Sequence, residues 1–172
     1  MNDKLFAKEK KKIFIYMVIV FSIISLLVFF IIMYTNVFVF EYKREDITFK
    51  YHSNFDIKKS KNDISLISND NLARIDIYTE RKDFIYSNSE YEAISNEVYN
   101  KYIDSKFSLL ESSCIDHMCT SLYESDKKNV KIVVEFRDSI LIVYKYEISK
   151  KNFDKYSESF DLVVNSFTVD VE

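Results

Sequence analysis

The sequence predicts an α+β protein in which an N-terminal transmembrane helix is followed by an antiparallel sheet packed with helices. An uncharged apolar run covers residues 13–34. Later runs alternate apolar and polar residues, as half-buried strands do, and two segments repeat apolar residues at helical spacing. These elements follow the order strands, helix, strands, helix, strand. That order favours helices packed on an antiparallel sheet.

The composition narrows the possible functions. The chain has 172 residues, a formal net charge of -3, and neither glycine nor proline. Loops that cradle phosphates or dinucleotides need glycine for close backbone approach, so we expect no such cofactor. Nucleic-acid binding requires a concentrated basic surface, so we expect no nucleic-acid partner. The abundance of Ile, Lys, Asn, Tyr and Phe is typical of a low-GC bacterial genome.

The apolar run at 13–34 is interrupted only by Ser22 and Ser25. At about 1.5 Å per residue its helix is roughly 33 Å long, enough to cross a hydrocarbon core of about 30 Å. A buried core helix of this length should show a polar face. A cleaved signal peptide should have an apolar region of only about 7–15 residues that ends in small residues. We therefore predict an uncleaved signal anchor.

Charges on either side of this run predict its orientation. The first twelve residues carry five lysines against two acidic residues, whereas basic and acidic residues are mixed after the run. By the positive-inside rule, the N-terminus lies in the cytoplasm. The predicted parts are a cytoplasmic basic tail (1–12), a transmembrane anchor (13–36), a juxtamembrane connector (37–45) and an extracytoplasmic domain (46–172).

Period-two patterns rich in β-branched and aromatic residues predict the strands. Clusters of Asn, Asp and Ser separate them and can form turns without glycine. We expect residues 46–51 and 54–59 to form a first hairpin, and residues 72–79 to form a single strand. Residues 129–136 and 139–148 should form a later hairpin.

Two segments, 89–105 and 152–165, have helical spacing. Ser87 and Glu90 form a plausible capping box before the first helix. A short strand at 166–171 should close the domain. The apolar stripes expected to face the sheet are Tyr91, Ile94, Val98 and Tyr102 in the first helix, and Phe153, Tyr156, Phe160 and Val164 in the second.

The C-terminal segment NFDKYSESFDLVVNSFTV resembles the closing signature of PsbP-like domains, in which an aromatic-rich helix and a valine pair precede Ser-Phe and a last strand. ITFKYHSNFDI is similar to the opening of that family. The likeness covers residues 46–170 and implies a three-layer α-β-α sandwich with a binding or assembly role. The chain departs from the family in having no Pro or Gly in its turns. The resemblance implies no site residues.

The segment CIDHMC, residues 114–119, holds both cysteines. The runs on its two sides are strand-like, so a four-residue loop would set Cys114 opposite Cys119. An extracytoplasmic location permits a disulfide, which we favour as a structural staple. The alternatives are two free thiols, a metal site that includes His117, and a redox pair. Structural zinc takes four ligands, however, and redox pairs have the spacing Cys-x-x-Cys.

No catalytic motif is recognised, and we predict no catalytic, cofactor-binding or metal-binding residue. His52 is interpreted as a solvated turn histidine, with a Ser-His-Asp triad as the alternative. We expect a single-pass membrane protein that presents a binding or scaffolding domain for assembly of an envelope complex. Its partners would be the lipid bilayer, through residues 13–36, and a protein of the envelope. An extracytoplasmic enzyme, or an outer sensor subunit with a transmembrane partner, is the alternative.

Overall fold

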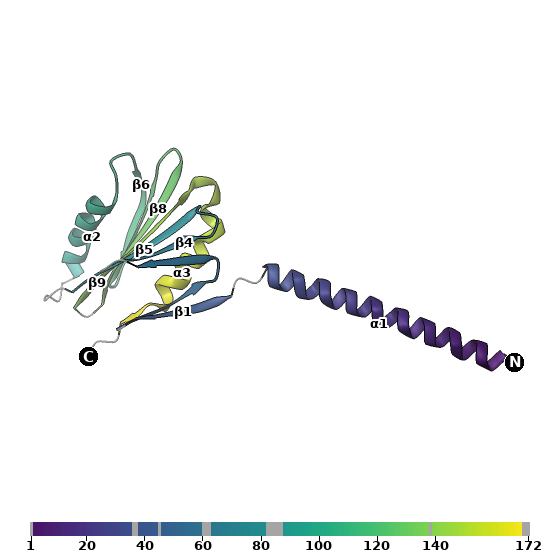
Figure 1. Cartoon of the computed structure of the whole chain (residues 1–172). Coiled ribbons are helices and arrows are strands. Elements are labelled where there is room, and N and C mark those ends of the chain that lie inside the picture. Colours follow the sequence, from purple (N-terminus) through teal and green to yellow (C-terminus); the bar gives the residue numbers. More distant parts are fainter. Residues whose placement is uncertain are drawn as a thin grey trace. The chain divides into compact units, whose positions relative to one another are not determined.

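The computed structural model describes residues 2–35, 38–44, 46–59, 63–81, 88–137 and 139–169. The chain divides into two compact units, Met1–Phe38 and Val39–Glu172. The first unit contains one long helix, and the second contains the strands and the remaining helices (Figure 1).

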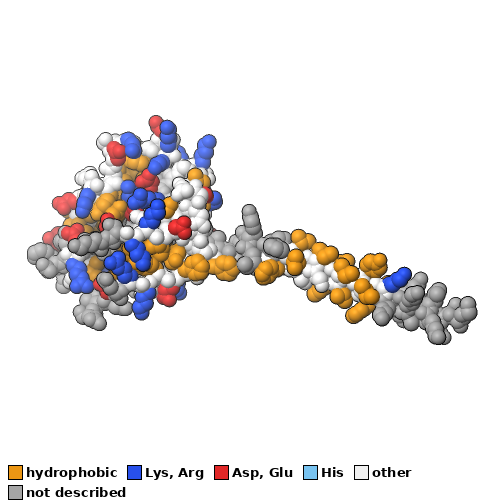
Figure 2. Space-filling view, in the orientation of Figure 1, with side chains coloured by type: hydrophobic (Ala, Val, Ile, Leu, Met, Phe, Trp, Pro, Cys, Tyr) orange, Lys and Arg blue, Asp and Glu red, His pale blue; other side chains and the backbone are white. Residues whose placement is uncertain are grey.

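The helix of the first unit is α1 (Asn2–Thr35). Its stretch Lys12–Phe29 has a mean hydropathy of 2.6, and none of that stretch is buried inside the protein. Apolar side chains lie along the described part of this helix in Figure 2. A helix that is apolar on all sides belongs in a membrane or in a protein core. By length and composition α1 can cross a membrane, although a signal sequence has the same properties.

The second unit is built on two antiparallel sheets, one of seven strands and one of three. In the large sheet the spatial order is β3 (Phe55–Lys59), β4 (Asp63–Ser68), β5 (Ala73–Arg81), β9 (Ile140–Ser149), β8 (Lys128–Arg137), β7 (Met118–Glu124) and β6 (Ser108–Ile115). In the small sheet it is β1 (Val39–Arg44), β2 (Ile47–His52) and β10 (Thr168–Val169).

Each face of the large sheet carries its own apolar core. On one face, α2 (Asn88–Tyr102) covers β7, β8 and β9. On the other face lie the small sheet, the 3₁₀ helix η1 (Lys150–Tyr156) and α3 (Ser157–Ser166). Figure 1 shows α2 and α3 separated by the large sheet. This three-layer arrangement confirms the predicted α+β fold class.

Alternation along the strands explains why both faces are covered. In β9, Tyr144 and Tyr146 belong to the core beneath α3, whereas Val143 belongs to the core beneath α2. Successive strand side chains point to opposite faces, so a central strand that is apolar at consecutive positions needs a layer on each side. The predicted hairpin of β8 and β9 is present with a continuous antiparallel register.

The helical stripes also face the sheet as predicted. Tyr91 and Val98 of α2 are buried, as are Phe160 and Val164 of α3. The second helical segment begins as η1 and becomes α-helical only at Ser157. The predicted capping box includes Ser87, which lies outside the described residues.

The expected first hairpin, between residues 46–51 and 54–59, is wrong. These residues form β2 and β3, which belong to different sheets: β2 pairs with β1 and β10, whereas β3 pairs with β4. The turn at Ser53 and Asn54 passes the chain from one sheet to the other. Both edges of β2 are occupied by strands that the sequence pattern did not place beside it.

One of those strands, β1, comes from the expected connector at 37–45. Val39–Arg44 pairs along its whole length with β2, and Tyr42 is buried against Phe49 with ring centroids 4.8 Å apart. The folded unit therefore includes residues from Val39 onward. The other strand, β10, begins at Thr168 and not at 166, because α3 extends to Ser166; residues 170 and 171 of the expected run lie outside the described residues.

A partly buried ion pair attaches the segment after α3 to the large sheet. Glu135 is only 8% exposed and accepts hydrogen bonds from Arg137 Nε and from the Tyr144 hydroxyl, each at 3.0 Å. Arg137 Nη1 also donates to the carbonyl oxygen of Phe167 at 2.7 Å. Burial, together with the Glu135 carboxylate, raises the pKa of Tyr144 far above its ordinary value, so its hydroxyl remains a donor.

Candidate functional site

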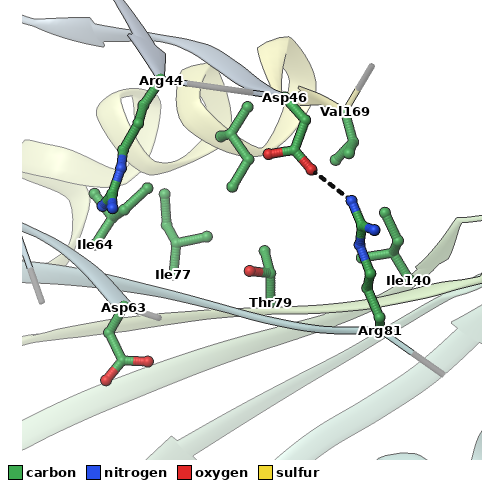
Figure 3. Close-up of a pocket in the computed structure, with 10 residues that line it drawn as sticks. Arg44, Asp46, Asp63, Ile64, Ile77, Thr79, Arg81, Ile140 and Val169 are labelled. Carbon is green, nitrogen blue, oxygen red and sulfur yellow. Dashed lines mark hydrogen bonds and ion pairs between the residues drawn. The ribbon is translucent and has the colours of Figure 1, made fainter. Parts of the chain in front are cut away.

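A hollow of about 360 Å³ lies where the small sheet meets the large one (Figure 3). Its apolar lining comes from both sheets, and four charged side chains and one hydroxyl surround this lining. The apolar residues are Ile47, Ile64, Ile77, Ile140 and Val169; the polar ones are Arg44, Asp46, Asp63, Thr79 and Arg81.

An ion pair on one side of the hollow joins the two sheets. Arg81, at the end of β5, places Nη2 3.1 Å from Asp46 Oδ2, in the turn between β1 and β2. In Figure 3 this pair lies on the opposite side of the hollow from Arg44 and Asp63. The Arg81 side chain is 79% exposed, so this pair stabilises the fold little and its groups are accessible to a ligand.

These features suit binding of an amphiphilic group. The volume is near the lower end of the range for ligand pockets, about 300–1,000 Å³. Aliphatic side chains such as Ile77 can contact an apolar body, while the arginines and aspartates flank it with both signs of charge. Thr79 is the only hydroxyl among the described lining residues, and neither His nor Cys is among them.

The structure joins Cys114 and Cys119 by a disulfide at the end of the β6–β7 hairpin. The two residues are direct cross-strand partners, with their Cα atoms 4.0 Å apart. The expected four-residue loop is shorter, because Ile115 pairs with Met118 and leaves a turn of Asp116 and His117. Asp116 has φ of 53°, a left-handed conformation that Asp tolerates better than most residues.

His117 is exposed and packs its ring edge-on against Tyr91, with ring centroids 5.3 Å apart. Its carbonyl oxygen accepts a hydrogen bond from the Phe136 amide at 2.9 Å. Both cysteine sulfurs of the segment are in the S–S bond, and no group of three metal-ligating side chains occurs in the described part of the chain. The S–S bond joins β6 to β7 next to the turn.

His52 has a different environment from the predicted solvated turn. It ends β2, is only partly exposed, and lies with Nδ1 2.8 Å from the Ser159 hydroxyl of α3. Ser159 is 5% exposed, and the described residues place no carboxylate in a hydrogen bond with the His52 ring. This pair fastens α3 to the small sheet and lacks the third member of a triad.

A polar cluster on the α2 side of the large sheet was not predicted as a unit. Asp76, only 4% exposed, accepts hydrogen bonds from Ser65 Oγ and from Arg74 Nε, the latter at 2.8 Å. Burial, then the Asp76 carboxylate, raises the pKa of Tyr78 to about 12. The sequence placed Arg74, Asp76 and Tyr78 on one strand face, but the contact with Ser65 depends on the pairing of β4 with β5.

A second hollow, of about 630 Å³, opens beside the end of α2. Its basic residues are largely neutralised by acidic neighbours in the same hollow. Lys128 and Lys145 each pair with Glu147, and Lys150 pairs with Glu124. Mutual pairing makes this surface a weaker candidate than the hollow of Figure 3 for holding an ionic ligand.

No family model and no curated protein matches the chain. Among solved structures, the cyanobacterial PsbP protein CyanoP from Synechocystis is similar, with a TM-score of 0.57 and 14% identity, over 78% of this chain and 94% of that one. A protein from Bacteroides thetaiotaomicron has a TM-score of 0.52 and 10% identity, over 78% of this chain but 48% of its own length. These likenesses show that the chain has a PsbP-like fold.

Proposed function

We propose that this chain is a single-pass membrane protein that presents a PsbP-like binding and scaffolding domain outside the cytoplasmic membrane. Its basic N-terminal tail would stay in the cytoplasm, and its folded domain would support assembly of an envelope complex. The observation that carries this proposal is the exposed apolar stretch Lys12–Phe29, which precedes a folded unit with a PsbP-like fold in the same chain.

Simple energetics support an anchoring role for α1. Its apolar side chains, such as Phe14, Phe21 and Leu26, are 61–73% exposed within the protein. Burial of apolar surface contributes about 25 cal/mol per Å², so transfer of this helix into lipid is strongly favourable. The lysine-rich tail before α1 supports the proposed orientation.

The anchor can be tested by the mass and location of the mature protein. Membranes are washed at alkaline pH, and the retained protein is analysed by intact mass. An uncleaved anchor predicts retention in the membrane with residues 1–36 present. A soluble product that lacks the N-terminal segment would instead identify a cleaved signal sequence.

Binding would use the hollow of Figure 3, because it combines an apolar floor with accessible charges. In-cell cross-linking followed by affinity purification tests this role. Arg81→Glu places a negative charge beside Asp46, so that the two side chains repel each other. This variant should strongly reduce partner capture. Lys58→Glu, which also reverses an exposed charge but lies on β3 outside the hollow, should leave capture unchanged. Equal capture by both variants would assign the binding surface elsewhere.

A further inference from the structure

Strand β6 forms an open edge of the large sheet. Among the described strands it pairs with β7 alone, and all eight of its residues are exposed. Its sequence SLLESSCI carries a single charge, at Glu111. Leu109, Leu110 and Ile115 are 53%, 50% and 72% exposed. An exposed edge with apolar residues and few charges is suited to pairing with another strand.

The opposite edge of the same sheet has the reverse character. β3 contains Asp56, Lys58 and Lys59 within five residues, and all three are exposed. Charged side chains, lysines above all, are a common device for preventing edge-to-edge association. The charges on the β3 edge therefore oppose pairing with a further strand, whereas the β6 edge carries few charges and is open to such pairing.

Backbone geometry shows which residues of β6 face the open edge. The Cα atoms of Cys114 and Cys119 are 4.0 Å apart, closer to the spacing of a non-hydrogen-bonded pair, about 4.5 Å, than to the 5.5 Å of a hydrogen-bonded pair. The N–H and C=O of Cys114 thus point away from β7. Register is regular from Glu111 to Ile115, so the N–H and C=O of Ser112 point the same way.

We propose that β6 pairs antiparallel with β6 of a second copy of this chain, about a two-fold axis at Ser112. The outward backbone groups of the two Ser112 residues then bond each other, and Cys114 lies opposite Leu110. The same register sets Leu109 of each copy opposite Ile115 of the other, so apolar side chains contact each other at both ends of the pairing. It also sets Glu111 of each copy opposite Ser113 of the other, so the two carboxylates do not face each other.

Other registers and directions fit less well. A parallel arrangement in register stacks Glu111 on Glu111, as does an antiparallel arrangement centred on Glu111. The bulge at Leu109–Glu111 falls in the outer parts of the proposed pairing, and the centre from Glu111 to Ser113 is regular in both copies. The disulfide and the hydrogen bond between Ser112 and Ser121, 2.7 Å long, hold the β6–β7 hairpin in place for pairing.

Pairing through one strand buries little surface, so it depends on a high local concentration. Anchoring in one membrane would supply that concentration, and in this respect the inference rests on the proposed function. The two can fail separately. Recovery of the chain in the soluble fraction would contradict the anchor, whereas absence of pairing among membrane-bound copies would contradict the dimer.

Photo-cross-linking of the full chain in its membrane tests the pairing. The photoreactive residue benzoylphenylalanine replaces Ile115, and in a control it replaces Lys58 on β3. Irradiation should yield a product of twice the chain mass only for the first, with residue 115 joined to residues 108–111 of another copy. No product, a link from 115 to 115, an equal yield from position 58, or a link to a different protein would overturn the proposal.

A matched pair of variants at Ser113 tests the register. Ser113 is exposed, so either substitution should leave the folded domain intact, as circular dichroism can verify. Ser113→Glu places a second carboxylate opposite Glu111 of the other copy, on each side of the two-fold axis. The repulsion should lower the cross-linked fraction roughly tenfold. Ser113→Lys sets a lysine opposite Glu111 and should retain or raise it. Equal yields from the two variants would contradict this register.

Discussion

At the scale of residues, side chains distant in sequence connect the elements of the folded domain. Asp70, in the turn between β4 and β5, is one example. It accepts hydrogen bonds from Lys155 Nζ at 2.8 Å and from the Tyr156 hydroxyl at 2.6 Å, and both donors belong to η1. The hydroxyl of Ser68 and the amide of Leu72 also donate to it. One carboxylate thus shapes its own turn and attaches η1 to the sheet.

This geometry predicts a loss of stability in acid. Burial alone would raise the pKa of Asp70, but hydrogen bonds from Lys155, Tyr156 and Ser68 lower it well below the ordinary value. A depressed folded-state pKa contributes stability that is present above the unfolded pKa, about 3.9, and is lost as pH falls further. Asp70→Asn should therefore lower the free energy of unfolding near neutral pH, with the deficit shrinking below about pH 4.

Urea denaturation of both proteins between pH 7 and pH 3 measures this difference. Asp56→Asn, at an exposed position on β3, is the matched control and should show little deficit at any pH. A deficit for Asp70→Asn that stays constant through acid would contradict the assigned role of the carboxylate.

Phe160 tests the apolar stripe that the sequence placed on the closing helix. It is 1% exposed and stacks on Tyr146 with ring centroids 5.3 Å apart. Phe160→Ala should cost about 3–5 kcal/mol of unfolding free energy. Leu72→Ala, at a 41% exposed position, should cost less than about 1 kcal/mol in the same assay. Similar costs for the two would contradict the packing of α3.

The Cys114–Cys119 bond closes a very short loop, so the chain-entropy model assigns it only about 2 kcal/mol. A double Cys→Ser variant should fold with roughly this loss. Mass spectrometry of protein isolated with thiols blocked at once should show no alkylated cysteine in the wild type. Alkylation of both cysteines would refute a bond in the mature protein. Stoichiometric zinc bound to the protein would instead support the metal site that includes His117.

At the scale of elements, the small sheet depends on strands from both ends of the folded unit. β1 and β10 flank β2, which has no other partner among the described strands. Phe49 at the centre of β2 is fully buried between Tyr42 of β1 and Phe167, which precedes β10, with ring centroids at 4.8 and 5.9 Å. An aromatic stack therefore joins the beginning of the unit to its end.

Removal of β1 should destabilise the domain. A fragment that starts at Val39 retains Tyr42 over Phe49, whereas a fragment that starts at Asp46 leaves Phe49 and one edge of β2 uncovered. The shorter fragment should lose at least about 3 kcal/mol, comparable to truncation of a buried aromatic residue. Urea denaturation of the two fragments measures the difference, and equal midpoints would show that β1 contributes nothing to stability.

At the scale of the whole molecule, the chain combines an apolar helix and a folded domain with opposite solvent requirements. The stretch Lys12–Phe29 exposes apolar side chains, whereas both cores of Val39–Glu172 are covered. On the folded domain, Figure 2 shows basic and acidic side chains interspersed over the visible face. The proposed membrane anchoring would satisfy both requirements, with the first unit in lipid and the second in water.

The proposed topology predicts the outcome of proteolysis on intact spheroplasts. Protease added outside should digest the domain after residue 41 and leave the lysine-rich tail protected. A tag at each end, detected separately, reports the two outcomes in one experiment. Protection of the C-terminal tag would reverse the orientation and would remove the compartmental reason for a disulfide.

Local periodicity was sufficient to predict the apolar helix, the strand pair β8–β9 and the buried stripes of α2 and α3. Tyr91, Ile142 and Phe160 face their cores because spacing along one segment decides which side chains share a face. The PsbP-like fold was predicted from the resemblance of ITFKYHSNFDI and NFDKYSESFDLVVNSFTV to the opening and closing segments of that family.

The tertiary structure decided which elements meet. Pairing of β2 with β10, the contact of His52 with Ser159, and the hollow that brings Asp46 beside Arg81 all join residues far apart in sequence. No repeat within one segment encodes such contacts, because they form only when packing of several elements closes the intervening chain. The sequence by itself therefore determined the elements and their buried faces, and three-dimensional packing decided the partners of each strand and the place of the candidate site.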